Sequence, residues 1–269
     1  MNLKDRVAVV TGAGSGIGRA TALSLARRGC HLALADIDEA GLDGTHARAL
    51  EEGVRASKHR LDVADRAAVA ALPADVRKSH DRVDLLVNNA GVALGGHFEQ
   101  VSETDFDWLM EINFHAVVRM TRAFLPVLRA SDDARIVNVS SVFGLVSPPG
   151  QCAYSASKFA VRGFSNALRF ELAGSRVGVS VVHPGGVATA IARNARVSAD
   201  TSAEEKRSRL AQAEKLLRLP PEEAGEIIVR GVEKRRARIL VGRDAVFIAL
   251  IERLFPVNYW SLLGRGIQS

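Results

Sequence analysis

The sequence predicts one doubly wound α/β domain, in which about seven parallel strands are flanked by helices on both faces. Runs rich in Val, Ile and Leu alternate with longer helical segments from residue 6 to about residue 241. Several of these runs are apolar throughout, as expected for strands that helices cover on both faces. The alternation predicts right-handed crossovers between parallel strands. The expected strands are Val7–Val10, Leu32–Ala35, Ala56–Leu61, Leu85–Val87, Ile136–Val139, Val179–Val182 and Ile239–Val241.

Helical segments fill the intervals between these strands, and two regions depart from the alternation. Residues 186–219 are polar, charged and rich in alanine, with no expected strand, and a long insertion after a strand is commonly a cover over an active site. The domain is expected to span residues 1–242, and 243–269 form an apolar C-terminal extension. This extension would be a partner interface, a wall of the substrate pocket, a membrane-surface segment or a helix that completes the core. The clearest helices are Ile17–Arg28, Ala64–Ser79, Thr104–Arg129 and Ala153–Leu172.

Composition indicates a soluble globular protein, because 47% of the 269 residues are hydrophobic and 25% are charged. Cys30 and Cys152 cannot form a disulfide framework, which favours a reducing cytoplasmic compartment. We expect no secretory signal and no membrane-spanning segment. The formal net charge is +6, but no aromatic residues interleave with the basic ones, which argues against nucleic acid as a partner.

A glycine-rich segment, TGAGSGIG at Thr11–Gly18, follows the first expected strand and precedes a helix. Glycines let the backbone approach a pyrophosphate that the N-terminus of the helix then holds. Methyltransferases and simple turns also contain glycine clusters, but the strand–helix context is the one that a Rossmann dinucleotide site requires.

Asp36 ends the second expected strand, eighteen residues beyond Gly18. A carboxylate at this point binds both hydroxyls of an adenosine ribose and repels a 2′-phosphate. Ser15, directly before Gly16, provides no positive charge for such a phosphate. Both observations favour NAD over NADP, although an aspartate here would also serve to cap a turn.

Tyr154 and Lys158 lie four residues apart, so that on a helix both side chains leave the same face. A nearby ammonium stabilises a phenolate, and we expect Lys158 to lower the pKa of Tyr154 from its ordinary value of about 10. Ser141 lies thirteen residues before Tyr154. Strand alternation lets only one of Ser140 and Ser141 face a cleft, and the spacing favours Ser141.

These motifs occur in one order along the chain: TGAGSGIG, Asp62, NNAG, Asn113, Ser141, YSASK and HPGGVAT. With them the chain resembles the short-chain dehydrogenase/reductase family, in its form of approximately 250 residues, from about Lys4 to Val241. The resemblance implies an NAD(P)-dependent oxidoreductase that forms homodimers or homotetramers through the helices containing Asn113 and Tyr154.

The resemblance also implies a catalytic tetrad of Asn113, Ser141, Tyr154 and Lys158. Tyr154 would exchange the proton with an alcohol or ketone, and Lys158 would bind the nicotinamide ribose. Ser141 would hydrogen-bond the substrate oxygen, and Asn113 would hold a water that connects Lys158 to solvent. The expected cofactor-binding residues are Gly12, Ser15, Gly16, Ile17, Gly18, Asp36, Asp62, Val63, Asn89, Ala90, Gly91, Tyr154, Lys158, Pro184, Gly185, Val187 and Thr189.

The expected substrate is a lipophilic secondary alcohol or ketone, because the segment after Ser141 is apolar. Besides Ser141 and Tyr154, we expect Phe143 and His97 to contact it, and Ile191 in the cover would extend the same surface. The histidines show no metal-ligand spacing, so no metal is expected. Two other functions stay open: an NADPH-dependent ketoreductase, acting for example on an acyl chain, and a catalytically silent dinucleotide-sensing protein. The apolar extension would also suit a peripheral contact with a membrane.

Overall fold

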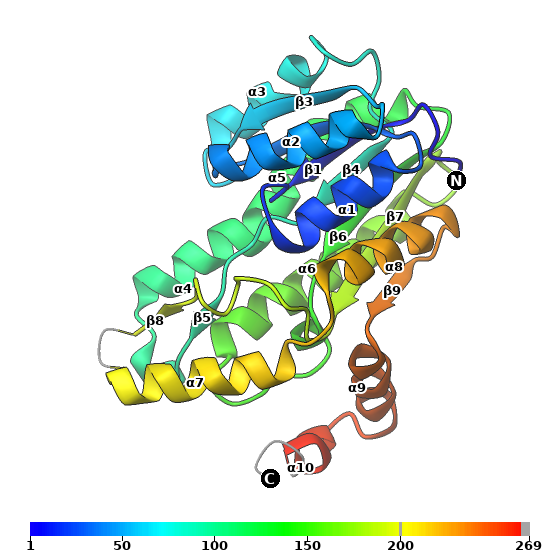
Figure 1. Ribbon diagram of the computed structural model, residues 1–269. Helices are drawn as coiled ribbons and strands as arrows, with labels where there is room; N and C mark the ends of the chain where they lie inside the picture. The colour runs from blue at the N-terminus through cyan, green and yellow to red at the C-terminus, as the bar shows by residue number, and fades with distance from the viewer. Residues whose placement is uncertain (199–200, 265–269) are drawn as a thin grey trace.

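A computed structural model describes residues 1–198 and 201–264 (Figure 1). Its centre is a sheet of seven parallel strands in the order β3-β2-β1-β4-β6-β7-β9. The order in which the chain adds strands reverses between β1 and β4. Open α/β sheets bind ligands beside such a switch point, at the carboxyl ends of the strands. The strands are β1 (Val7–Thr11), β2 (His31–Asp36), β3 (Ala56–Arg60), β4 (Leu85–Asn88), β6 (Ala134–Val139), β7 (Val177–Pro184) and β9 (Arg238–Val241).

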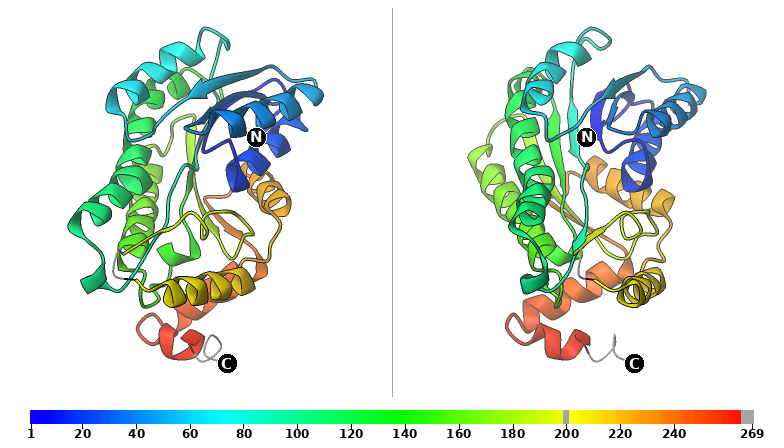
Figure 2. Two further views of the ribbon diagram at one scale, coloured as in Figure 1. Left: turned by 60° about the vertical axis from the view of Figure 1, so that its left-hand side comes forward. Right: turned by 90° about the vertical axis from the view of Figure 1, so that its left-hand side faces the viewer.

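Helices cover both faces of this sheet, so the molecule has three layers (Figure 2). One face is packed by α1 (Gly16–Ala26), α2 (Glu39–Glu51) and α8 (Pro221–Glu233). The other face is packed by α3 (Arg66–Val76), α5 (Ala116–Arg129) and α6 (Cys152–Glu171). The predicted doubly wound α/β fold is therefore confirmed. Each expected strand is present within two residues of its expected bounds, and for the central strands the reason is that burial on both faces selects uninterrupted apolar runs.

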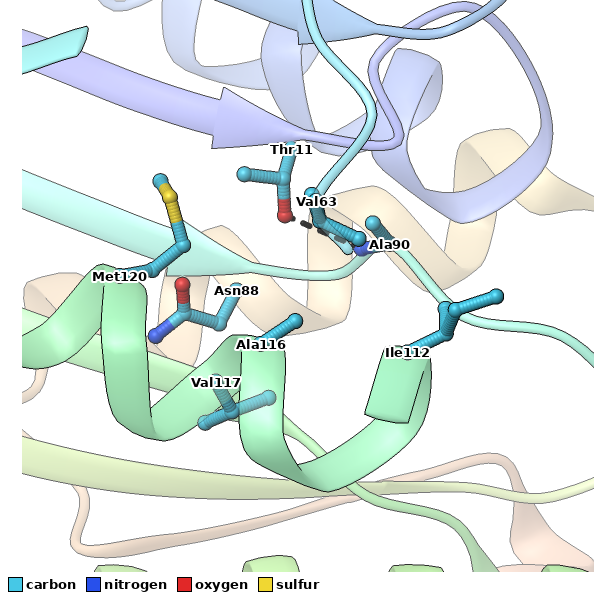
Figure 3. Close-up of a pocket in the computed structure, with 8 residues that line it drawn as sticks. All are labelled: Thr11, Val63, Asn88, Ala90, Ile112, Ala116, Val117 and Met120. Atoms are coloured by element: carbon cyan, nitrogen blue, oxygen red, sulfur yellow. Dashed lines mark hydrogen bonds between the residues drawn. The ribbon is translucent and has the colours of Figure 1, made fainter. Parts of the chain in front are cut away.

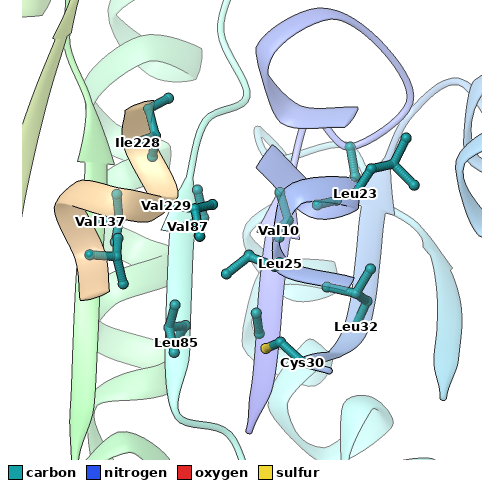
Figure 4. Packing of buried hydrophobic residues seen from close by; sticks show 14 of the residues in the cluster. Val10, Leu23, Leu25, Cys30, Leu32, Leu85, Val87, Val137, Ile228 and Val229 are labelled. Carbon is teal, nitrogen blue, oxygen red and sulfur yellow. The ribbon is translucent and has the colours of Figure 1, made fainter. Parts of the chain in front are cut away.

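The core beneath α1 and α8 is closely packed by β-branched and leucine side chains (Figure 4). Gly225 permits this approach, since a Cβ added there would lie 2.5 Å from the Ala20 carbonyl carbon. Ion pairs also join the two helices, because Arg28, two residues past the end of α1, binds Glu226 and Glu233 on α8 at 2.7 and 3.0 Å.

The expectation of no strand within residues 186–219 is wrong. Arg196 and Val197 form a short strand, β8, that pairs in parallel with β5 (Leu94–Gly95) in the loop after β4. Two residues are too few to produce an apolar pattern, and backbone pairing with a distant loop has no local sequence signal. The segment also contains α7 (Ala203–Leu216).

The two ends of this segment meet at Gly186. The Gly186 carbonyl accepts the N–H groups of Arg218 and Leu219, both at 2.9 Å, and the Leu219 carbonyl accepts the Ala188 N–H at 2.8 Å. The segment expected to be a cover is therefore a loop that leaves the sheet after β7 and returns to its own starting point.

The long helix expected at Thr104–Arg129 is interrupted. A π-helical turn at Glu111–His115 lies between α4 (Glu103–Met110) and α5. Arg119 holds the turn by donating to the Glu111 carboxylate at 2.7 Å and to the Glu111 carbonyl at 3.4 Å. Such turns occur frequently at functional sites, and this one contains Asn113.

The C-terminal extension forms α9 (Arg243–Leu254) and α10 (Tyr259–Leu263), which lie beyond β9 at one end of the molecule (Figures 1 and 2). Ala249 packs in a small cluster with Leu145 and Val146. The Tyr259 hydroxyl accepts the Ser147 N–H at 3.1 Å. The extension thus packs against the segment after Ser141. Within the described part of the chain, no helix combines the length and the apolar character needed to cross a membrane.

Candidate active site

The glycine loop has the shape that a pyrophosphate requires. Gly12 and Gly16 have φ angles of +64° and +52°, in the left-handed region that favours glycine. A Cβ on Gly18 would lie 1.9 Å from the Gly12 carbonyl oxygen. Ser15 precedes α1 without a side-chain cap on the helix, so the first N–H groups of α1 are available to an anion.

Asp36 lies beside this loop at the end of β2. One carboxylate oxygen accepts the Gly14 N–H at 2.7 Å, and the other accepts the Asp38 N–H at 3.0 Å. Asp36 therefore does cap a turn, as the alternative interpretation stated. Its side chain is only half-buried, and carboxylate oxygens have further lone pairs for ribose hydroxyls.

The residues after β4 close the other side of the loop. The Thr11 hydroxyl accepts the N–H groups of Asn89 and Ala90 at 3.0 and 3.1 Å. The Asn89 amide donates to the carbonyls of Thr11 and Gly12 at 3.0 and 3.2 Å. A cavity of about 10 Å³, lined among others by Thr11, Val63 and Ala90, lies behind this junction (Figure 3). Asp62, also expected at the cofactor, is exposed just before Val63.

The end of β7 reaches the same loop from the other side. A Cβ on Gly16 would lie 3.1 Å from Cγ2 of Thr189, so the expected residues Pro184, Gly185, Val187 and Thr189 lead into the glycine loop. Gly186 donates its N–H to Asp244 at 2.6 Å. Asp244 lies 58 residues away on α9, which is why sequence reasoning missed it. Together these groups fit a dinucleotide laid across the carboxyl ends of the strands.

Tyr154, Lys158 and Ser141 lie together at the carboxyl end of β6. Ser141 lies beside the phenol of Tyr154 and acts to lower the pKa of that phenol, and the Ser141 hydroxyl accepts the Phe143 N–H at 3.1 Å. Lys158 Nζ lies 5.6 Å from the centroid of the Tyr154 ring and donates to the Val139 carbonyl at 3.3 Å. The structure thus brings together the three groups that the spacing singled out.

The electrostatics differ from the expectation. Burial raises the pKa of Tyr154 to about 12, and Ser141 only partly offsets this. Burial also lowers the pKa of Lys158 to about 8. Lys158 Nζ donates to the Val139 carbonyl and not to the phenol, so its effect on the pKa of Tyr154 stays a prediction.

Ser140 points away from Tyr154, as strand alternation predicts. Its buried hydroxyl donates to the Lys158 carbonyl at 2.8 Å. His183 supports the neighbouring residue by donating from Nδ1 to the Ser141 carbonyl at 2.9 Å, and burial lowers the pKa of His183 to about 4. His183 is therefore neutral near pH 7 and holds the backbone of Ser141. Sequence reasoning assigned it no role, since a histidine in a strand has no signal of this kind.

Asn113, in the π-helical turn, links α6 to the loop after β4. Its Oδ1 accepts the Val92 N–H at 2.8 Å, while its Nδ2 donates to the Val92 carbonyl and to Ser157 Oγ at 3.0 and 3.2 Å. Ser157 in turn donates to the Tyr154 carbonyl at 2.7 Å. A Cβ on Gly91 would lie 3.1 Å from Asn113 Oδ1 and 3.5 Å from Lys158 Nζ. Asn113 thus lies near Lys158, and the water that it would hold stays a prediction.

Phe143 and His97, the two further residues expected to contact the substrate, lie in different surroundings. Phe143 stands edge-on to Tyr154, with ring centroids 6.1 Å apart at 86°. His97 is exposed at the start of a 3₁₀ turn (Phe98–Gln100), where its N–H donates to Gln100 Oε1 at 2.9 Å. Gly96 joins this loop to the segment after Ser141 by donating to the Gly150 carbonyl at 3.1 Å. Phe143 adjoins the reactive groups, and His97 lies on a neighbouring loop.

Known proteins resemble the chain along almost its whole length. The profile of the short chain dehydrogenase family matches residues 6–200. A Mycobacterium tuberculosis protein named as an oxidoreductase, SadH, is 43% identical over 269 residues, which cover 99% of this chain and 96% of that protein.

Two solved structures extend the resemblance to the fold. A short-chain dehydrogenase/reductase from Burkholderia phymatum in complex with NAD has a TM-score of 0.87 at 32% identity, over 94% of this chain and 95% of that one. An alcohol dehydrogenase from Thermococcus sibiricus complexed with 5-hydroxy-NADP has a TM-score of 0.75 at 27% identity, over 88% and 96%. With its glycine loop and the Ser141–Tyr154–Lys158 cluster, the chain belongs to the short-chain dehydrogenase/reductase family and is an NAD(P)-dependent oxidoreductase.

Proposed function

We propose that the protein uses NAD to interconvert a lipophilic secondary alcohol and its ketone. The observation that carries this proposal is that Ser141, Phe143 and Lys158 surround Tyr154: the Phe143 ring lies edge-on to the Tyr154 ring, and Lys158 Nζ lies 5.6 Å from its centroid. A proton donor, an oxygen-binding hydroxyl and an apolar side chain meet there at the end of the predicted cofactor cleft.

Three residues of the chain transfer the proton, bind the substrate oxygen and stabilise negative charge. The bound nicotinamide accepts or supplies the hydride. Burial keeps Tyr154 protonated near pH 7, so its hydroxyl is ready to donate to a ketone oxygen that Ser141 also binds. Lys158 is cationic below its pKa of about 8, and its charge stabilises negative charge that develops on the phenol.

A preference for NAD over NADP is supported by two groups near the adenosine end. Asp36 presents a half-buried carboxylate at the end of β2. Arg19, a cation close to this loop, donates to the Gly14 carbonyl, to Thr45 Oγ1 at 2.9 Å and to the Gly41 carbonyl at 3.2 Å. Its guanidinium is therefore engaged with the protein. The B. phymatum relative was solved with NAD, whereas the T. sibiricus relative carries an NADP derivative.

A lipophilic substrate is supported by the walls around Tyr154. Phe143, Leu145 and Val146 follow Ser141 and pack with Ala249 of α9, so the segment beside the reactive groups offers apolar contacts and few hydrogen bonds. We also propose a cytoplasmic homo-oligomer. Subunits would meet through α4–α6, where Phe159 is exposed and α4 carries a surface hollow of about 450 Å³.

The substitution Tyr154→Phe tests the chemical role. It removes only the hydroxyl, and turnover should fall by about 10²–10⁴ while the Kd for NADH changes little. Substrates are screened as secondary alcohols and ketones of increasing apolar size, followed at the NADH absorbance band in both directions. Preserved turnover in the variant would refute the role of Tyr154.

Initial rates with NADH and NADPH test the cofactor preference. A clear NADPH preference would contradict the interpretation of Asp36 and favour a ketoreductase. Tight NADH binding without turnover on any substrate of the panel would instead favour a dinucleotide-sensing protein.

A further inference from the structure

The outer face of α9 is apolar although it faces solvent. Arg243, Val246, Phe247 and Leu250 follow the helical spacing i, i+3, i+4 and i+7, so they lie on one side of the helix. Val246 and Leu250 are exposed, and Phe247 is 57% exposed. The opposite side carries Ala245, Ile248 and Ala249 and packs against the protein. Both faces of α9 are thus apolar, whereas a surface helix usually carries polar side chains on its outer face.

The apolar surface continues past the end of α9. Leu254, Phe255 and Leu262 are exposed, and Val257 is 86% exposed. We call these residues and the outer face of α9 together the tail surface. Single exposed apolar side chains are ordinary, but several along one helix face and the chain that follows it indicate an interaction site.

The charges of the tail surface have one sign. Arg243 and Arg253 lie at its two ends and are both exposed, with no acid at ion-pair distance among the residues that the structure describes. The acids of α9 are engaged elsewhere. Asp244 accepts the Gly186 N–H, and Glu252 faces Arg162 at 3.9 Å. The partner of this surface must therefore be apolar and negatively charged.

We propose that the tail surface docks on an anionic phospholipid bilayer. A second copy of the chain fits less well, because an isologous contact joins a patch to itself and would bring arginines together without acids. Anionic headgroups over an acyl layer supply both features that the surface lacks. At 12 residues, α9 is about 18 Å long and lies in the interface, since crossing the acyl layer takes about 30 Å.

The position of the tail surface connects docking to the active site. On its inner side, α9 packs with Leu145 and Val146, and α10 holds Ser147 through the Tyr259 hydroxyl. Both contacts fall on the segment that begins at Ser141. A lipophilic substrate dissolved in the bilayer would thus meet the enzyme beside its reactive groups. This consequence rests on the proposed function, whereas the docking of the tail surface is independent of it.

Co-sedimentation of the full chain with vesicles tests the docking surface without cofactor or substrate. The probes are phosphatidylcholine vesicles with and without phosphatidylglycerol. We expect sedimentation with the anionic vesicles, weakened by added salt. Leu250→Ser should reduce the partition coefficient about tenfold. The matched control is Leu50→Ser on α2, because Leu50 and Leu250 are similarly exposed, at 50% and 53%.

A charge variant separates the electrostatic contribution. Arg243→Gln with Arg253→Gln should weaken binding to anionic vesicles about fivefold per arginine and leave the affinity for neutral vesicles unchanged. Retained NADH binding in each variant shows that the fold is intact.

Three outcomes would overturn the proposal: no sedimentation of the unmodified chain, an equal loss in Leu50→Ser and Leu250→Ser, or a smaller oligomer of Leu250→Ser by light scattering. The last would identify the tail surface as a subunit interface. Each is read independently of turnover, so a failed substrate screen leaves the docking result standing.

Discussion

Gly225 determines how closely α8 approaches α1, and the substitution Gly225→Ala tests that packing. The added Cβ would lie 2.5 Å from the Ala20 carbonyl carbon, 2.6 Å from its oxygen and 2.8 Å from the Thr21 nitrogen. These are backbone atoms, which cannot rotate away. Restoring an ordinary contact of 3.4 Å requires about 0.9 Å of separation (3.4 − 2.5) between the two helices.

The expected cost of this overpacking is about 1–3 kcal/mol in the free energy of unfolding. Alanine is favoured over glycine in a helix by about 1 kcal/mol, which masks part of the loss. Gly163→Ala on α6 supplies the control, because its added Cβ meets nothing within 4 Å. The difference between the two variants isolates the clash, and it corresponds to a difference in Tm of about 2–12 °C.

Thermal unfolding of both variants at one protein concentration measures this difference. Because α1 also presents its N-terminus to the cofactor site, the Kd for NADH should rise in Gly225→Ala and stay unchanged in Gly163→Ala. Equal Tm values for the two variants would refute the packing argument.

Three further predictions concern titration and the cover. Burial lowers the pKa of Lys158 from 10.5 to about 8. Between these pH values the unfolded chain binds one more proton than the folded protein, so the free energy of unfolding rises with pH. Lys158→Met should abolish this rise, measured by urea unfolding. Burial lowers the pKa of His80 from 6.5 to about 4, so stability falls as the pH drops through this window, and a His80→Gln variant that melts with an unchanged pH dependence would contradict the assignment. The Arg196 guanidinium lies 3.5 Å from the Trp108 ring centroid and anchors β8. Arg196→Ala should raise the KM for the ketone severalfold at unchanged NADH affinity. Arg193→Ala, a control in the same segment, should change neither constant.

The central fold could be predicted from the sequence because its strands are buried on both faces. A run such as Val7–Thr11 is fully buried, and such burial leaves a continuous apolar signature. The π-helical turn at Glu111–His115 could not be predicted, since the apolar spacing is helical on both sides of it. The same holds for β8, whose pairing depends on a loop about a hundred residues earlier.

The candidate site, like the fold, could be predicted from the sequence only in part. The spacing of Tyr154 and Lys158 is local and places both on one helix face. The pKa of Tyr154 is not local, because burial by distant segments raises it. The contact of Asp244 with Gly186 likewise joins residues 58 positions apart. Local periodicity therefore located the reactive groups but could not describe their electrostatic surroundings.

The meeting of both ends of the cover at Gly186 has a consequence for engineering. Because the chain departs and returns at one point, residues 190–217 can be exchanged as a cassette without disturbing any strand register of the central sheet. Because the segment is expected to cover the cleft, grafting cassettes from relatives of different selectivity should alter which molecules enter it, while Thr189 and the residues around Tyr154 stay in place.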